Sequence, residues 1–284
     1  MGARSEGLYG KYLVKYNNGV YDGEFLNGEK HGNGQFKWDN GEQYNGEWKY
    51  DKLTGKGQFK FANGNIYDGE FLNGEKNGKG HMKFANGSFY IGDWKDDKLN
   101  GKGQLKLANG NLYDGEFLNN EMQGKGLMKW ANNAQYEGDW KNDNRDGKGE
   151  MKFPNGSQYV GDWKNDARSG KGLMKWANGD QYDGDWNNDE ISGNGIYKWA
   201  NGDEYDGDWK NNERSGKGLL KWANKAMYYG DWKNGNRDGK GQMKFSDGSL
   251  YDGDWFNDLR HGHGDYKSDK GVKYNGKWLF DKQM

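Results

Sequence analysis

The stretch Tyr67–Phe89 reads YDGEFLNGEKNGKGHMKFANGSF, and the next one, Tyr90–Leu112, reads YIGDWKDDKLNGKGQLKLANGNL. Both have the same length and share a Tyr-x-Gly-acid-aromatic start, a central Gly-Lys-Gly and a late Ala-Asn-Gly. A search for internal repeats extends this unit along the chain without insertion or deletion. We number positions 1 to 23 from the repeat tyrosines, which give eleven full repeats and a partial twelfth: residues 21, 44, 67, 90, 113, 136, 159, 182, 205, 228, 251 and 274.

Each repeat contains two segments that alternate with a period of two. Positions 1, 3 and 5 are Tyr, Gly and Trp or Phe, whereas position 4 is acidic in every full repeat. Positions 12 to 18 alternate Gly, Gly and large apolar residues with polar ones, and position 17 is always Lys in the full repeats. Such alternation indicates two strands, each with one aromatic face.

Two turns connect these strands. Asn-Gly at positions 20–21 is a strong hairpin signal, and positions 7–8 are also rich in Asn, Asp and Gly. A three-residue loop at positions 19–21 keeps both aromatic faces on one side, whereas a two-residue loop would turn one of them away. This register predicts that Lys56 lies opposite Glu70 and that Lys79 lies opposite Asp93.

The glycines at positions 3, 12 and 14 are expected on the aromatic face. Without side chains there, aromatic rings of neighbouring repeats can lie flat over bare backbone. Glycine weakens a strand by itself, so ring packing has to compensate for it. We therefore interpret the Tyr, Trp and Gly of the motif as packing residues rather than ligand contacts.

The pattern resembles the MORN (membrane occupation and recognition nexus) repeat, a motif of the same length that opens Tyr-x-Gly-x-Trp and continues to Gly-x-Gly. YVGDW at 159–163 with GKG at 170–172 is a close match. The resemblance implies an all-β fold, an elongated single-layer antiparallel sheet of stacked β-hairpins. We expect residues 1–20 to be an N-terminal cap or tail and residues 21–284 to be the repeat array.

The composition argues against several other classes. The chain has 284 residues, no cysteine and a net charge of -1, so neither disulfides nor a basic nucleic-acid surface is expected. The four histidines do not complete a catalytic triad, and HGH at 261–263 supplies only two metal ligands. We expect no enzyme activity, no catalytic or metal residues, no cofactor, and a cytoplasmic location.

Departures from the repeat at position 10 suggest one binding surface. Five of the six arginines of the chain stand there, at Arg145, Arg168, Arg214, Arg237 and Arg260. Two explanations remain open. Each guanidinium stacks on the preceding Trp inside the scaffold, or the row presents forked donors to a partner's carboxylates or phosphates.

Leucines suggest a second surface in the first half of the chain, where positions 6 and 10 alternate. We expect about one exposed leucine beside the turn in each repeat, either as turn packing or as a docking strip: Leu26, Leu53, Leu72, Leu99 and Leu118.

Regularly spaced side chains on a repeat array suit a non-catalytic scaffold that holds protein partners along an extended surface. The resemblance adds ciliary radial spokes and the cytoskeleton as settings and a homodimer as one assembly. The alternative is a peripheral protein that binds phosphoinositide head groups through its lysine rows. Position 4 carboxylates oppose that alternative, because membrane attraction needs a clustered basic excess.

Overall fold

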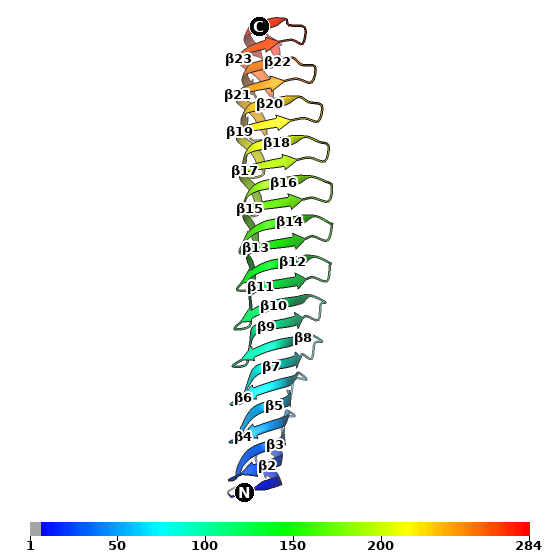
Figure 1. Ribbon diagram of the computed structural model, residues 1–284, viewed down its shortest axis with the longest axis vertical. Helices are drawn as coiled ribbons and strands as arrows, with labels where there is room; N and C mark the ends of the chain where they lie inside the picture. Colours follow the sequence, from blue (N-terminus) through cyan, green and yellow to red (C-terminus); the bar gives the residue numbers. More distant parts are fainter. Residues whose placement is uncertain (1–6) are drawn as a thin grey trace. The chain divides into compact units, whose positions relative to one another are not determined.

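The computed structural model describes residues 7–284 and divides into two compact units, residues 1–144 and 145–284. Each unit is all-β, and in each one consecutive strands pair antiparallel with their sequence neighbours (Figure 1). Strands contact chiefly these neighbours, so the sheet of each unit is a single layer of stacked hairpins. The predicted fold class is confirmed.

The sheet of the first unit runs in chain order. Its strands are β1 (Gly10–Tyr16), β2 (Gly19–Leu26), β3 (Glu29–Trp38), β4 (Gln43–Lys49), β5 (Lys52–Lys60), β6 (Ile66–Leu72), β7 (Glu75–Lys83), β8 (Phe89–Lys95), β9 (Lys98–Lys106), β10 (Leu112–Leu118), β11 (Glu121–Lys129) and β12 (Gln135–Lys141).

The sheet of the second unit repeats this arrangement. Its strands are β13 (Asn144–Lys152), β14 (Gln158–Lys164), β15 (Ala167–Lys175), β16 (Gln181–Asn187), β17 (Glu190–Lys198), β18 (Glu204–Lys210), β19 (Glu213–Lys221), β20 (Met227–Lys233), β21 (Asn236–Lys244), β22 (Leu250–Phe256), β23 (Leu259–Lys267), β24 (Lys273–Leu279) and β25 (Lys282–Gln283).

The loop at positions 19–21 has the predicted length. In the third repeat the amide of Phe84 donates to the carbonyl of Ser88, and Gly87 closes the loop with φ +88°. Because that conformation is left-handed, glycine suits the last loop position. The resulting register pairs Lys56 with Glu70, as predicted, and likewise Lys79 with Asp93.

The turn at positions 7–8 is a two-residue hairpin turn. Both of its residues have positive φ, as at Asp96 (49°) and Asp97 (64°). This is the type I′ geometry, which matches the twist of the flanking strands and favours Asn, Asp and Gly. The second strand of each repeat therefore begins at position 9, three residues earlier than the alternation alone indicates.

A β-bulge interrupts each hairpin beside position 4. In the fourth repeat Gly92 pairs with Gly103 and Trp94 with Leu99, so β9 holds two more residues than β8 in this interval. Gly101 lies in the bulge with φ +68°, where a Cβ atom would collide with Asp93. The position 12 glycine thus serves the bulge, and the expectation that it forms bare backbone under the rings is wrong.

The glycines at positions 3 and 14 do lie beneath a ring, but the ring belongs to their own repeat. A Cβ atom on Gly69 or Gly80 would overlap the ring or hydroxyl of Tyr67. The hydroxyl of Tyr67 donates to the carbonyl of Glu70 at 3.0 Å. Every repeat tyrosine from Tyr21 to Tyr251 is at most 1 % exposed, so these rings form the core of each sheet.

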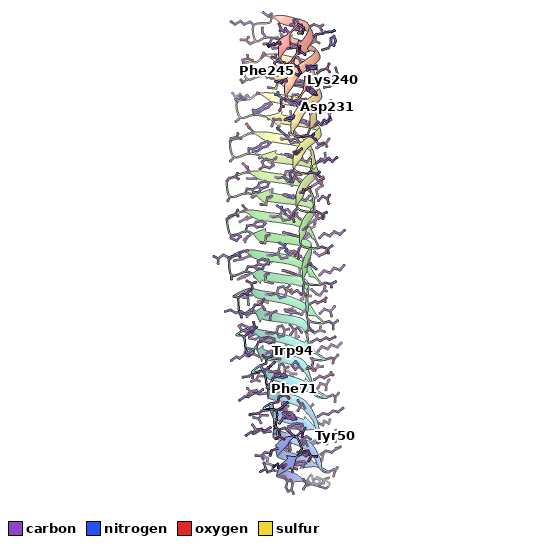
Figure 2. All side chains as sticks on the ribbon, turned by 180° about the vertical axis from the view of Figure 1, so that it is seen from behind. Tyr50, Phe71, Trp94, Asp231, Lys240 and Phe245 are labelled. Atoms are coloured by element: carbon purple, nitrogen blue, oxygen red, sulfur yellow. The ribbon has the colours of Figure 1, made fainter. Side chains whose placement is uncertain are left out.

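The aromatic rings of position 5 connect successive repeats edge to face. Tyr67 contacts Phe71 of its own repeat at 5.0 Å and Trp94 of the next at 5.3 Å, both in T-shaped geometry. Figure 2 labels Phe71 and Trp94. Trp94 also donates its indole N–H to the carbonyl of Gly80 at 3.3 Å. Each ring contact of this kind stabilises by about 0.5–1.5 kcal/mol beyond its buried area.

The expected N-terminal cap or tail, residues 1–20, lies partly outside the described residues, which begin at residue 7. Within the described part, β1 pairs antiparallel with β2, and Val14 faces Tyr21. Val14 is 7 % exposed and extends the buried row of the first repeat.

Candidate interaction surface

The arginines of position 10 lie on the aromatic face of the second unit. Arg168 pairs across the hairpin with Trp163, so both side chains share the face of the repeat tyrosines. Its guanidinium stacks on Trp186 of the following repeat, 4.3 Å from the ring centre. The cation–π interpretation of the sequence is therefore correct, but the stacking partner is the next Trp and not the preceding one.

The same contact recurs for every arginine of the row. Cation–π contacts stabilise by about 0.5–2 kcal/mol according to their desolvation. The stacked pairs, each 4.2–4.3 Å apart, are Arg145 with Trp163, Arg168 with Trp186, Arg214 with Trp232, Arg237 with Trp255 and Arg260 with Trp278.

A carboxylate at position 8 of the next repeat holds most of these guanidinium groups. Arg168 Nε donates to Asp189 Oδ1 at 2.8 Å, and Nη2 donates to the Asp189 carbonyl at 3.0 Å. Burial raises the pKa of Asp189, but hydrogen bonds from the Arg168 amide and side chain outweigh it, so the pKa is lowered. Equivalent pairs join Arg145 to Asp166, Arg237 to Asp258 and Arg260 to Asp281.

Arg214 is the exception in this row. Position 8 of the next repeat is Gly235, and Arg214 Nη2 donates to its carbonyl at 2.6 Å. Burial, together with the nearby Arg237, lowers the pKa of Arg214, although Asp258 and Tyr205 act in the opposite direction. The side chain thus keeps its place on Trp232 without an adjacent carboxylate of its own.

Lysine fills the same place in two repeats of the first unit. Lys30 lies 5.4 Å from the ring centre of Trp48 and pairs with Asp51 at 2.8 Å. Lys76 lies in the same way 5.2 Å from Trp94, and its ammonium is 2.7 Å from the carboxylate of Asp97. We call this arrangement a cation latch. It consists of the cation at position 10 of one repeat together with two residues of the next repeat, the Trp at position 5 and the residue at position 8.

A hollow of about 450 Å³ opens beside the arginine row. Arg145 and Arg168 line one part of it, and Phe153 and Trp176 from position 18 line another. Arg168 Nη1 approaches Met174 Sδ at 4.0 Å although the two residues are six positions apart on β15. Both side chains therefore line the hollow.

The leucines do not form one strip. Position 10 pairs with position 5, as Leu99 does with Trp94, whereas position 6 pairs with position 9, as Leu72 does with Glu75. Cross-strand partners share a face, so Leu53 and Leu99 lie on the aromatic face and Leu26, Leu72 and Leu118 on the opposite one. Only Leu72 and Leu118 are exposed, at 52 % and 49 %, so the expected exposed leucine in every repeat is wrong.

The opposite face carries two lysine rows with different surroundings. Position 13 lysines form ion pairs with position 4 of the next repeat where that acid is Asp, as Lys217 does with Asp231 at 2.6 Å. Asp231 also accepts the bulge amide of Lys240 at 2.8 Å; Figure 2 labels Asp231 and Lys240. Burial by itself would raise the pKa of Asp231. Hydrogen bonds from Lys217 and Lys240 outweigh burial, so the pKa is lowered.

The second lysine row, at position 17, is mostly without carboxylates. Lys152 pairs with Glu150, and Glu204 pairs with both Lys198 and Lys221. Within residues 7–284 the other members form no ion pair: Lys37, Lys60, Lys83, Lys106, Lys129, Lys175, Lys244 and Lys267. This row is exposed on the face opposite the tyrosines.

The histidines add little chemistry to these surfaces. His261 lies 4.8 Å from the ring of Phe280, and its Nδ1 is buried without a hydrogen-bond partner. Among residues 7–284 no three His, Cys, Asp or Glu side chains converge as metal ligands. In the same residues no helix is long and apolar enough to cross a bilayer.

The sequence contains a signal for the cation latch, but it lies in the following repeat and not at position 10 itself. In the full repeats each cation at position 10 is followed by Trp at position 5 of the next repeat, whereas Leu53 and Leu99 are followed by Phe71 and Phe117. Comparing each position with its counterpart in the next repeat would have identified the stacking partner.

Hairpins that recur at a constant interval, stacked antiparallel around buried tyrosines, define a repeat protein of the all-β class. Eleven consecutive segments that together span residues 21–273 match the MORN repeat. The chain therefore belongs to the MORN repeat family, whose defining feature is a structural repeat. No curated protein sequence matches the chain.

The solved structures similar to this chain include two TCP-type domains. The TCP10 domain of Danio rerio CPAP has 10 % identity and a TM-score of 0.39, with 78 % of this chain and 99 % of that chain covered. The TCP domain of Drosophila melanogaster SAS-4, in complex with a proline-rich motif of Ana2, has 15 % identity and a TM-score of 0.32. Its match covers 63 % of this chain and 85 % of that chain.

Proposed function

We propose that this chain is a non-catalytic scaffold that holds protein partners along its repeats within a cytoskeletal assembly, and specifically in a cilium. The observation that carries the proposal is the repeat register. Within each unit, equivalent side chains recur at every second strand, a spacing of about 9.6 Å. Such a surface suits partners that bind several repeats at once.

Two groups of residues are proposed as contacts for these partners. Arg145 and Arg168 of the arginine row border the hollow lined by Phe153 and Trp176, and their guanidinium groups can meet partner carboxylates there. The exposed leucines Leu72 and Leu118 offer apolar contacts on the opposite face of the first unit.

Changing Arg168, Arg214 and Arg237 together to Lys tests the arginine row. Lys30 and Lys76 already occupy the same place in the first unit, so the variant should fold. Lysine lacks the planar fork, and capture of a partner of the second unit should weaken while first-unit partners are unaffected. Cross-linking mass spectrometry on the native assembly identifies these partners, and unchanged capture of all of them would remove the arginine row from the proposal.

The alternative function, phosphoinositide binding, is supported by the position 17 lysines. Eight of them lack an ion pair within the described residues and lie exposed, in each unit on the face opposite the tyrosines. Each could gain about 1 kcal/mol near an anionic leaflet. Co-sedimentation with phosphoinositide vesicles across a salt series separates the two functions: salt-sensitive binding favours lipid, and no binding favours the protein scaffold.

A further inference from the structure

A hollow of about 630 Å³ lies on the face opposite the tyrosines, over β19 to β24 of the second unit. Its side walls come from positions 2, 15, 17 and 23 of the repeats. Among the residues of these side walls, Leu219, Met227, Tyr229 and Leu250 are large and apolar, and the last three are 37 %, 56 % and 43 % exposed. These residues are separate from the arginine row, which lies on the aromatic face.

The other repeats of the second unit show that the fold does not require these apolar residues. At position 23, where Met227 and Leu250 stand, the three preceding repeats have Gln158, Gln181 and Glu204. At position 2, Tyr229 replaces the aspartates of the two preceding repeats. Their backbone pairing is the same in all of these repeats. Exposed apolar residues that the scaffold does not need mark an interaction site.

Lysines alternate with these apolar residues in one row. Met227 pairs with Lys244, Lys244 with Leu250, and Leu250 with Lys267, which pairs in turn with Lys273. Neighbouring strands are about 4.8 Å apart, so the row presents apolar and cationic groups side by side. Within residues 7–284 none of the three lysines forms an ion pair. Lys221 at the start of the row differs, because Glu204 neutralises it.

Carboxylates border the hollow only in the neighbouring row. Asp252 accepts a hydrogen bond from Gln242 at 2.9 Å, and Asp265 accepts one from Asn275. The hollow therefore has a cationic side, the lysine row, and an acidic side, the neighbouring row. A flat anionic bilayer would meet both sides at once, whereas a narrow peptide can lie along the lysine row alone.

We propose that this hollow docks a short acidic segment of a protein partner. A leucine or aromatic side chain of the segment packs among Met227, Tyr229 and Leu250, and its carboxylates pair with Lys244, Lys267 and Lys273. The proposal deepens the scaffold function, on which it rests, by assigning one partner chemistry to one site. Charge complementarity sets the orientation of the segment, and the apolar anchor supplies most of the affinity.

A triple variant, Met227→Gln with Tyr229→Asp and Leu250→Gln, tests the site. It restores the residue types that the same positions hold in preceding repeats, so folding should be preserved, which circular dichroism and thermal melting check. The matched control is Ile66→Gln with Phe89→Gln, the same change at position 23 in the first unit. Both residues are half-buried there and alternate with Lys60 and Lys83 in the same way.

Random dodecapeptides displayed on phage are selected against the full chain and then measured by fluorescence anisotropy. We expect enriched peptides that combine Asp or Glu with a Leu or aromatic anchor, and at least ~10-fold weaker binding to the triple variant, equal to about 1.4 kcal/mol. Binding to the control should be unchanged. Equal binding to the triple variant, enrichment of non-acidic peptides, or no enrichment would each overturn the proposal.

Two further measurements identify other occupants. Binding of phosphatidylserine vesicles that the triple variant abolishes would assign the hollow to membranes. A dimer in sedimentation velocity that the triple variant dissociates would assign it to a second copy of the chain. Either result overturns the acidic-segment proposal. The scaffold function fails separately, if native cross-linking finds no protein partner on any repeat.

Discussion

The two units share one core and differ in how they connect successive repeats. Both place a tyrosine over the glycines of positions 3 and 14, and both donate Trp indole N–H groups to the preceding repeat. At position 10 the first unit alternates Lys with Leu and ends with Met122, whereas the second unit uses Arg in five of six repeats. The core is therefore fixed by backbone geometry, whereas position 10 varies: Met122 and Ile191 are followed by Trp140 and Trp209, just as the cations are followed by Trp.

The largest expected effect acts on the common core and should not distinguish the units. Burial and, to a smaller extent, nearby carboxylates raise the pKa of the repeat tyrosines, together bringing that of Tyr251 to about 12. A raised folded pKa contributes stability that is complete below the unfolded value near 10 and is lost as the pH rises above it. Both units should unfold together in this range, with tyrosinate absorbance and loss of circular dichroism coinciding. Ionisation of the repeat tyrosines in an intact fold would contradict the burial account.

A smaller effect is expected from filling one glycine in either unit. In Gly80→Val of the first unit and Gly172→Val of the second, the added side chain overlaps the ring of Tyr67 or Tyr159. Each should destabilise its own unit by about 3 kcal/mol, at the upper end of overpacking effects. Hydrogen exchange should show lost protection in the repeats around the substitution. An effect in only one unit would show that the core is not common to both.

A third prediction concerns the cation latch and depends on which cation is removed. Arg168→Ala removes the stack on Trp186 and leaves Asp189 without its partner, which should cost about 1–2 kcal/mol. Arg168→Lys should cost less than about 1 kcal/mol, because Lys76 forms the same latch in the first unit. Urea denaturation measures both. Equal losses for Ala and Lys would mean that the guanidinium fork itself is required.

The smallest expected effect comes from installing a latch where the first unit has none. Leu99→Lys with Phe117→Trp and Asn120→Asp copies the arrangement of Lys76, Trp94 and Asp97. The free energy of unfolding of this latch variant should lie within about 1 kcal/mol of the parent value. Leu99→Lys alone should be less stable than the variant with all three changes. Thermal melting of the single and triple variants measures the difference. A single variant as stable as the triple would show that the three positions are independent.

The sequence predicts the fold and the hairpin register because both follow from the period of two and from loop length, as Lys56 opposite Glu70 illustrates. It does not predict the role of Gly101, because the bulge is a tertiary arrangement between Asp93 and the amide of Lys102. The leucine strip is wrong for a related reason. A second strand that begins at position 9 places Leu99 and Leu72 on opposite faces.

Only part of the candidate site can be predicted from the sequence. The arginine row is conspicuous as a composition bias, yet the stacking partner of each arginine lies in the following repeat, as Trp186 does for Arg168. The hollow over β19 to β24 needed the structure, because its apolar residues come from three strands: Leu219 of β19, Tyr229 of β20 and Leu250 of β22.

A double-mutant cycle on Tyr159 and Gly172 tests the central claim, that each tyrosine ring occupies the space above the glycines of its own repeat. Urea denaturation of Gly172→Val, Tyr159→Ala and the combined variant supplies the unfolding free energies. The account predicts strong coupling: once the ring is gone, the valine methyls fit, and the double variant is no less stable than Tyr159→Ala alone. Additive losses would contradict the claim, because the ring and the glycine would then act independently.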